Sequence, residues 1–432
     1  VQNVSVEVEL VDFGFRHHCC STLEVDCARA NQRDLPTRVN ANDPYHTVRV
    51  RRIPGGAVMA DLPPRRVRLA AALAFRGAEL FVATQRPNQL YLLAGEQHED
   101  PSSVISRPNC AAILFAHTAG EASQTVLFPG VWISNACSDL LSHCEVVPNR
   151  LGDPPPEDQL AVRLAAMGPR RVVFDQLPPK MADAIRAVAP DVELVEDDFL
   201  TTLLRRRKDE ADLTAMREAA RVADLGMQAA FAQIRPGATC GEAIAVGTAA
   251  MLAAGAESVA MAPASGQGTW YLDSAEDPRR IIEEGDMVFI DMGIWVHGYL
   301  GDMTRAAIVG TGSAQQQDLL ATVQDAYRSA SRRMVHGARA SDIYQGVVDL
   351  YEARGWAPYF VHHLSHGLGL GGDVPRVADG SDEVLQMGDA LSCEPGCYVP
   401  DLGGARVENM IWVSDAGPVE LTTTPIDPEL GT

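Results

Sequence analysis

Short apolar runs alternate with helical periodicity between residues 61 and 200. Residues 65–77 carry apolar side chains at three- and four-residue intervals, which predicts a helix. Runs rich in branched and aromatic side chains predict strands at residues 79–84, 90–93, 111–115, 125–128, 171–174 and 192–195. Because short strands alternate with helices, we expect an α/β domain over residues 61–200.

A longer helical pattern begins after residue 200. Apolar side chains recur with helical spacing from Leu213 to Phe231, which predicts a helix that extends to about residue 232. The charged stretch at residues 205–210 is interpreted as a solvated linker and helix start. We therefore place a domain boundary near residue 200 and a second domain over residues 201–432.

Residues 1–60 show little periodicity and are broken by proline and glycine clusters, so we expect an irregular N-terminal extension. His17, His18, Cys19, Cys20 and Cys27 lie close together in this region. They lack the spaced pairs of a structural zinc site, so we interpret the cysteines as reduced thiols.

The second domain contains a repeated acidic pattern. A Gly-Asp pair at residues 285–286 is followed by Asp291 and, eleven positions later, by Asp302. A second Gly-Asp pair, at residues 388–389, is followed by Glu394 and, fourteen positions later, by Glu408. Each copy follows a helical pattern and leads into an apolar run, which predicts a hairpin with one carboxylate on each strand. We infer an internal duplication whose two halves bring the four carboxylates together.

Four carboxylates among apolar residues require nearby positive charge, because burying an unpaired charge costs several kcal/mol or more. Arg305 and Arg406 are the basic residues near the two hairpins, and two arginines would not neutralise four acids. Divalent metal ions would. Asp286 and Asp389 stand next to glycines and are interpreted as turn residues.

A histidine completes the candidate metal site. His366 opens a glycine-rich segment at residues 366–372 that allows close approach of backbone and ligands, and His362 and His363 are alternatives. Oxygen ligands with one imidazole suit Mn, Fe, Co or Zn better than Ca. Bridging carboxylates can hold a metal pair that activates a water molecule, so we expect hydrolytic chemistry.

The composition excludes several classes of function. A formal net charge of −21 makes nucleic acid an unsuitable partner, because phosphate binding needs a basic surface. The chain has no apolar run long enough to cross a membrane and no signal-peptide pattern. Nine scattered cysteines do not predict a disulfide framework. We expect a soluble cytoplasmic protein that acts on a small molecule or short peptide.

These residues resemble the pita-bread metallopeptidases, which include aminopeptidase P and prolidase. The matching segments lie at residues 288–294, 301–305, 361–370, 394–396 and 402–409, within a resemblance that covers about residues 65–425. It implies a creatinase-like α/β domain at residues 61–200 and an α+β pita-bread domain with a pseudo-twofold duplication at residues 201–432. It also implies a homodimer and two divalent metal ions, with Mn foremost and Co, Fe or Zn as alternatives.

The resemblance assigns a role to each matching ligand. Asp291 would bind one metal ion, and Asp302 and Glu408 would bridge both. His366 and Glu394 would complete the ligands of the second ion. Glu394 would also be the general base for the bridging water.

Further residues are expected around the substrate. His362 matches a histidine that holds substrate or the tetrahedral intermediate, and Arg406 matches a residue that orients the carboxylates. Xaa-Pro-specific members usually have a histidine near position 373 and another in the loop at residues 265–272. This chain has Asp373 at the first place and none in the loop, so Trp270, Tyr271 and Asp373 would line an altered pocket.

Three functions follow from this pattern. The leading one is an Xaa-Pro dipeptidase or aminopeptidase. The second is a lyase or amidohydrolase for a betaine-like or cyclic amidine compound, in which Asp373 would abstract a proton. The third is a non-catalytic binding module, which predicts eroded metal ligands. All five ligands are present, so we rank this function last.

Overall fold

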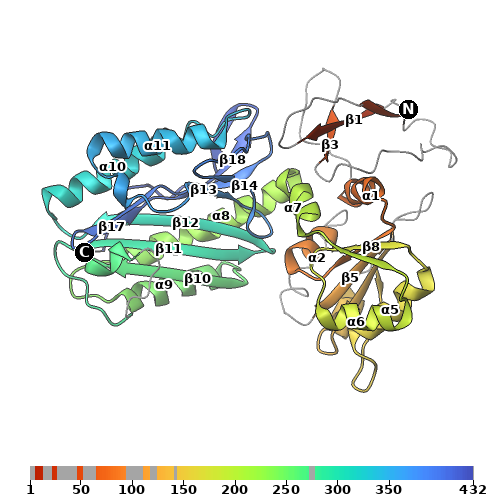
Figure 1. Cartoon of the computed structure of the whole chain (residues 1–432). Coiled ribbons are helices and arrows are strands. Elements are labelled where there is room, and N and C mark those ends of the chain that lie inside the picture. Colours follow the sequence, from red (N-terminus) through yellow and green to blue (C-terminus); the bar gives the residue numbers. More distant parts are fainter. Residues whose placement is uncertain are drawn as a thin grey trace. The chain divides into compact units, whose positions relative to one another are not determined.

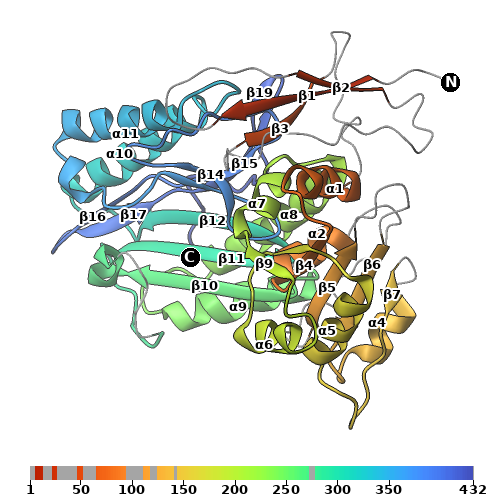
Figure 2. The same ribbon diagram turned by 45° about the vertical axis from the view of Figure 1, so that its right-hand side comes forward.

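The structure is a computed structural model that describes residues 5–12, 22–26, 46–51, 65–93, 110–116, 124–140, 144–271 and 278–431. The chain divides into two compact units between Thr201 and Thr202 (Figures 1 and 2). None of the helices described is long and apolar enough to cross a membrane. The histidines and cysteines at positions 17–20 and 27 lie outside the described residues.

The first unit contains a six-stranded mixed sheet in the order β7-β6-β5-β4-β8-β9. Its strands are β4 (Leu80–Ala83), β5 (Cys110–Ala116), β6 (Gln124–Pro129), β7 (Glu145–Val146), β8 (Arg171–Phe174) and β9 (Glu193–Glu196). Its helices are α1 (Arg65–Phe75), α2 (Arg86–Leu93), α4 (Ser134–Leu140), α5 (Pro156–Met167) and α6 (Pro179–Val188). Leu160 of α5 and Ile185 of α6 share a buried core with Val172 and Phe174 of β8. The predicted α/β class is confirmed.

One predicted strand of this unit is a helix. Residues 90–93 form the end of α2, and all four are buried. A run of four buried apolar residues does not distinguish a strand from a helix that is covered on several sides. Asn88 in the preceding turn is buried too, where its amide donates to Asp175 at 2.8 Å, so the helix is enclosed by polar as well as apolar contacts.

Three strands lie in the region that was expected to be irregular. They are β1 (Ser5–Asp12), β2 (Thr22–Asp26) and β3 (His46–Arg51), and they pair antiparallel in the order β2-β1-β3. Acidic and apolar residues alternate along β1, which is the period-two pattern of a strand. The prediction of irregular structure is wrong for these three segments.

The charged stretch before the long helix is also different from the prediction. Helix α7 (Asp198–Arg206) ends within it, and α8 (Glu210–Phe231) begins after the N-cap Asp209. Arg206 and Lys208 are only 5% and 2% exposed. The interpretation as a solvated linker is wrong, because acids distant in the sequence surround these cations.

The first half of the second unit packs two helices on a three-stranded antiparallel sheet (Figure 1). The helices are α8 and α9 (Cys240–Ala253), and the strands are β10 (Ser258–Ser265), β11 (Met287–Val296) and β12 (Tyr299–Ile308). A short 3-10 helix, η2 (Gly266–Trp270), follows β10. Met227 of α8 shares a core with Ile290 and Ile294 of β11, so the predicted helix packs on the predicted hairpin.

The second half contains helices α10 (Ala314–Ser331) and α11 (Ala340–Arg354), the 3-10 helix η3 (Ala357–Tyr359) and a five-stranded sheet in the order β14-β13-β15-β18-β19. The strands are β13 (Ser365–Gly367), β14 (Asp373–Val377), β15 (Ala390–Cys393), β18 (Asn409–Ser414) and β19 (Gly417–Glu420). Strands β16 (Gly396–Val399) and β17 (Gly403–Arg406) form a separate ribbon.

Matching backbone hydrogen bonds relate the two halves and support the internal duplication. In each half, the turn before the second helix bonds to the segment before the acidic hairpin, and the Gly-Asp pair bonds to the end of that hairpin. The equivalent bonds are Gly237 N to Ile282 O and Gly337 N to Leu385 O, and Gly285 N to Val309 O and Gly388 N to Val413 O.

The second acidic hairpin is longer than the first. Glu394 follows β15 and Glu408 precedes β18, and the β16–β17 ribbon lies between them in the chain. Strands β15 and β18 pair so that Cys393 lies opposite Asn409. The two glutamates therefore extend from the ends of paired strands, whereas the two aspartates lie within theirs.

Candidate metal centre

The first hairpin places two carboxylates on one face of its sheet. Strands β11 and β12 pair so that Asp291 lies opposite Thr304 and Gly293 lies opposite Asp302. Because side chains alternate between the two faces of a sheet, these four positions share a face. The hairpin alone therefore brings Asp291 and Asp302 close together.

The second half of the domain meets the first at Thr304. The backbone NH of Glu408 donates to the Thr304 carbonyl at 3.0 Å. The Thr304 hydroxyl lies 2.7 Å from Asp291 Oδ1 and 2.8 Å from Glu408 Oε2, and its single proton can be donated to only one of them at a time. Acids from both halves thus converge on one threonine.

Asp302, whose side chain is 15% exposed, and the buried Glu408 lie close to like charges. Burial, together with the charges of Asp291 and Glu394, raises the pKa of Asp302 well above its usual range. Burial, together with the charges of Asp302 and Glu394, raises the pKa of Glu408 in the same way. Both carboxyls therefore resist ionisation when no cation is close to them.

Two arginines lie beside these acids, and they bond differently. Arg406 Nη2 lies 2.8 Å from Asp291 Oδ2, and its Nε donates to the Thr304 hydroxyl at 3.1 Å. Arg305 is fully buried but donates to backbone carbonyls, including that of Glu408 at 2.6 Å. One arginine bonded to one carboxylate leaves an excess of negative charge at the junction.

His366 connects the acids of the two halves. Its Nε2 lies 3.5 Å from Asp302 Oδ2 and 3.5 Å from Glu394 Oε1. The Ser392 hydroxyl accepts from the backbone NH of His366 and donates to Glu394 Oε1 at 2.9 Å. A Cβ at Gly367 would come within 2.5 Å of the Asp373 backbone, so glycine is required where β13 and β14 pair beside His366.

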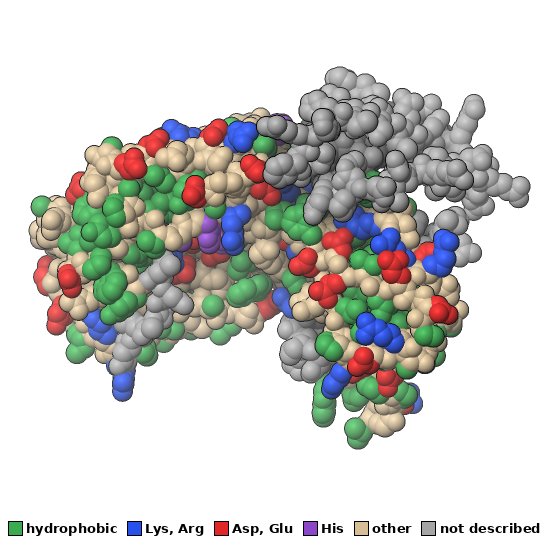
Figure 3. All heavy atoms as spheres, viewed as in Figure 1, with side chains coloured by type: hydrophobic (Ala, Val, Ile, Leu, Met, Phe, Trp, Pro, Cys, Tyr) green, Lys and Arg blue, Asp and Glu red, His purple; other side chains and the backbone are tan. Residues whose placement is uncertain are grey.

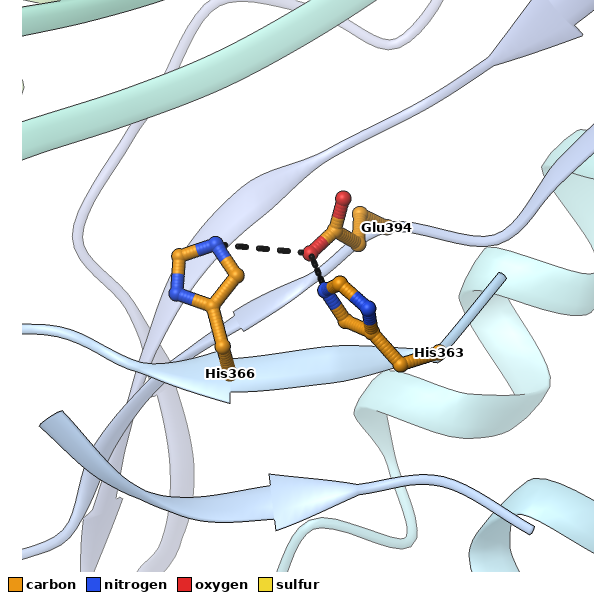
Figure 4. A group of neighbouring side chains, drawn as sticks. All are labelled: His363, His366 and Glu394. Carbon is orange, nitrogen blue, oxygen red and sulfur yellow. Dashed lines mark ion pairs between the residues drawn. The ribbon is translucent and has the colours of Figure 1, made fainter. Parts of the chain in front are cut away.

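The sequence ranks His366 ahead of His363, whereas the structure brings both to Glu394 (Figure 4). His363 Nε2 lies 3.3 Å from Glu394 Oε1. The donor atoms of His363, His366 and Glu394 lie within 4.8 Å of one another, as do those of Asp302, His366 and Glu408. Burial acts to raise the pKa of Glu394, but the interaction with His363 and the charge of His366 outweigh it and lower that pKa.

His362 and Arg406 meet at Tyr398, which no sequence pattern singled out. The Tyr398 hydroxyl lies 3.2 Å from His362 Nε2 and accepts from Arg406 Nη1 at 2.6 Å. A Cβ at Gly396 would approach His362 Nε2 to 2.8 Å, so the absence of a side chain there makes room for the imidazole. Burial lowers the pKa of His362, which favours the neutral ring.

The predicted aromatic wall lies at the end of η2. The rings of Trp270 and Tyr271 are 4.7 Å apart, and Tyr271 is 51% exposed. Thr269, in the same 3-10 helix, accepts from the backbone NH of Gly404 at 2.9 Å. This bond attaches η2 to β17, the strand that ends with Arg406.

Asp373 lies in a different environment from the one expected. Its side chain is fully buried on β14, with Oδ1 2.8 Å from Arg205 Nη2 and Oδ2 3.0 Å from Lys208 Nζ. The two cations lie close to both oxygens of the carboxylate and balance its charge. This pairing argues against the predicted pocket role, in which Asp373 would face the substrate and abstract a proton.

The donor set fits divalent metal ions. It combines buried carboxylates that repel one another with an imidazole nitrogen, and a cation among them would relieve the repulsion. Figure 3 shows a histidine beside acidic and basic side chains on the surface of the second unit. Carboxylate and imidazole ligands are typical of Mn, Fe, Co and Zn sites.

Known proteins resemble this chain in sequence. Residues 214–415 match the sequence profile of metallopeptidase family M24. The Xaa-Pro dipeptidase of Pyrococcus horikoshii is 30% identical over 255 residues, which cover 58% of this chain and 72% of that protein. The chain belongs to metallopeptidase family M24. The Xaa-Pro dipeptidase of Pyrococcus furiosus is 31% identical over 231 residues, which cover 53% of this chain and 66% of that protein.

Solved structures confirm the fold of this M24 metallopeptidase over most of its length. An Xaa-Pro dipeptidase from Bacillus anthracis matches with a TM-score of 0.71 and 24% identity, over 85% of this chain and 98% of that one. The prolidase from Pyrococcus horikoshii matches with a TM-score of 0.72 and 23% identity, over 84% and 98% of the two chains. The predicted combination of an α/β unit with a pita-bread unit is confirmed.

Proposed function

We propose that this M24 metallopeptidase is a dinuclear-metal-dependent hydrolase that acts as an Xaa-Pro dipeptidase or aminopeptidase. The observation that carries the proposal is the convergence of Asp302, Glu408 and His366, whose donor atoms lie within 4.8 Å of one another. The raised pKa of both carboxyls supports a bound cation as their missing partner. The two Pyrococcus relatives named as Xaa-Pro dipeptidases support the substrate class.

The five ligands divide between two metal positions in this proposal. Asp291 would hold one ion, His366 and Glu394 would hold the other, and Asp302 and Glu408 would contribute ligands to both. The contact of Arg406 with Asp291 supports a role for Arg406 in orienting that carboxylate. Mn is the ion we favour, with Co, Fe and Zn as alternatives.

Glu394 is the proposed general base. Metal ions at these positions would lower the pKa of a water molecule and polarise the scissile carbonyl. The lowered pKa of Glu394 keeps its carboxylate ionised and able to accept a proton from that water. Ser392, at 2.9 Å, holds the same carboxylate in place.

His362, Trp270 and Tyr271 are the proposed substrate contacts. In a neutral His362, Nδ1 donates to the His363 carbonyl at 2.6 Å, so Nε2, which lies 3.2 Å from the Tyr398 hydroxyl, can accept a hydrogen bond from a substrate NH. The exposed ring of Tyr271 and the ring of Trp270 offer faces that attract a free amino terminus.

The domain assignments belong to the same proposal. We assign residues 61–200 to a creatinase-like domain and residues 201–432 to the pita-bread catalytic domain, with residues 1–60 as an extension. The division of the chain between Thr201 and Thr202 supports this boundary. We also propose that two copies of the chain form a homodimer.

Metal analysis combined with a substrate panel tests the proposal. The purified protein would be assayed on Xaa-Pro dipeptides, longer Xaa-Pro peptides and small betaines after incubation with Mn or Co. We expect two divalent ions per chain and Xaa-Pro turnover with kcat/KM of about 10⁴ M⁻¹s⁻¹ or more. Failure to bind metal would contradict the dinuclear centre. Turnover of betaines without turnover of peptides would instead place the enzyme among hydrolases or lyases of non-peptide substrates.

A further inference from the structure

A second imidazole faces the candidate metal centre. Figure 4 shows the rings of His363 and His366 directed at the same oxygen of Glu394. The Nε2 atoms lie 3.3 Å and 3.5 Å from Glu394 Oε1. The His363 side chain is 31% exposed and that of His366 is 23% exposed, so both imidazoles are accessible from solvent.

These separations match atoms that share one metal ion. Ligand nitrogen and oxygen atoms about 2.0–2.2 Å from an ion lie about 3–4 Å from one another around it. A hydrogen bond from an imidazole NH to a carboxylate is commonly shorter, at about 2.7–3.2 Å. The 3.3 Å and 3.5 Å separations fit the first geometry better than the second.

The two possible ligand groups overlap at His366. One contains His363 and Glu394, and the other contains Asp302 and Glu408. An ion bound to His366 would therefore lie close to a second imidazole as well as to the two carboxylates of the other group.

We propose that His363 is an additional ligand of the ion that is held by His366 and Glu394. This inference rests on the proposed dinuclear function, and it adds a sixth protein ligand to the five proposed for the metal centre. The ion at this position then has two imidazole ligands, whereas the protein ligands of the ion at Asp291 are all carboxylates. Imidazole favours Zn, Co and Fe over Mn, so the two positions prefer different metals.

The effect of replacing His363 on metal binding tests the assignment. Metal-depleted full-length protein and its His363→Ala variant would be loaded with Zn, and X-ray absorption would count the imidazoles per chain. Competition with a chelator would measure the Kd for Zn and for Mn. We expect the count to fall from two imidazoles to one, and the Kd of one Zn site to rise about tenfold or more. The Kd for Mn should change less, because Mn depends more on the carboxylates.

Two further variants make the result specific. His297→Asn removes an exposed imidazole from a turn where φ is 51°, a conformation that asparagine tolerates, and should leave both measurements unchanged. His363→Asn replaces the ring with a smaller polar side chain in case the alanine variant does not fold, as judged by its thermal unfolding.

The outcomes separate this inference from the proposed function. A wild-type protein that binds two Zn ions, with an unchanged imidazole count and Zn Kd in folded His363 variants, would overturn the inference and leave the dinuclear centre intact. A wild-type protein that takes up no metal would overturn the dinuclear centre itself.

Discussion

Acids of low exposure form two groups within the second unit: Asp302 with Glu408, and Asp373 with Asp389. The two groups differ in the cations around them. Asp302 and Glu408 lie among other carboxylates, and the pKa of each is raised well above its usual range by burial and like charge. Asp389 is as buried as Glu408, but Arg206 donates to both of its oxygens, at 2.9 Å and 3.0 Å. Asp373 is held by Lys208 in a similar way.

The difference separates acids used for structure from acids available to a ligand. Where arginine or lysine supplies the positive charge, the carboxylate is satisfied and joins distant segments of the chain. Where no arginine or lysine pairs with the carboxyl group, its oxygens remain available to bind a metal ion. The two groups are neighbours, because Asp373 pairs with Gly367 in the strand that carries His366. Asp373, which is paired with cations, therefore lies in the strand that holds the backbone next to His366 in place.

The largest expected effect comes from removing the bridging acids. Asp302→Ala and Glu408→Ala, like removal of metal with a chelator, should abolish peptidase activity, because each removes a proposed bridge between the ions. In metal-free protein at neutral pH, Asp302→Asn should not lower the free energy of unfolding, because it replaces a carboxyl whose ionisation is opposed by burial and by neighbouring like charges. Assays on metal-loaded enzyme and urea unfolding of metal-free enzyme check the two statements. A large loss of stability in metal-free Asp302→Asn would contradict the comparison.

The next effect concerns stability. Arg206→Ala leaves Asp389 buried without its cation and should lower the free energy of unfolding by about 3–5 kcal/mol. Arg217→Ala is a matched control, because Arg217 is half exposed and its contact with Glu210 spans 3.7 Å. This surface pair should contribute less than about 1 kcal/mol. Equal losses in the two variants, measured by urea unfolding, would show that burial of Asp389 has no special cost.

Glu394→Gln should have a smaller effect, chiefly on catalysis. We expect it to fold normally, to keep at least one metal ion and to lose about a hundredfold in kcat, because an amide cannot take the proton of the water. Steady-state kinetics with metal analysis of the same sample measures this. A kcat close to that of the wild-type enzyme would mean that the metal ions alone activate the water.

The smallest effect is expected for Asp373→Asn. An amide retains some hydrogen bonding to Arg205 and Lys208 but loses the charge, so the free energy of unfolding should fall by about 1–3 kcal/mol. Metal content should be unchanged, and kcat/KM should change by a similar small factor on every substrate. A selective loss on one class of substrate, with stability and metals retained, would restore the role in the substrate pocket.

The acidic hairpins could be predicted because their signals are local. The Gly-Asp pairs, the apolar strands and the carboxylates between them recur in the same order within about 25 residues. The sequence predicts one carboxylate on each strand of the hairpin, and the register of the two strands in the structure places Asp291 and Asp302 on one face. Residues 90–93 show the limit of such patterns, because four buried residues suit a helix as well as a strand.

Tyr398 was missed, and His363 was only an alternative to His366, because contacts across the fold are needed to recognise both. Tyr398 matters because His362 and Arg406 both reach its hydroxyl, and tyrosine in an apolar segment has no distinctive spacing. His363 stood in the sequence beside two other histidines, and its proximity to Glu394 depends on how β13 and β15 are joined.

The sequence by itself determined which chemical groups this protein brings to its centre: four carboxylates in two duplicated hairpins, and a histidine before a glycine-rich turn. These depend on residue identity and on spacing along the chain, which are fixed before folding. Only the tertiary structure decided which acids pair with arginine or lysine and which are available to a metal ion. Arg205 and Asp373 are 168 positions apart and only 2.8 Å apart in space. Electrostatic interactions depend on distance and burial in the folded state, so the same residue types become a salt bridge in one place and a metal site in another.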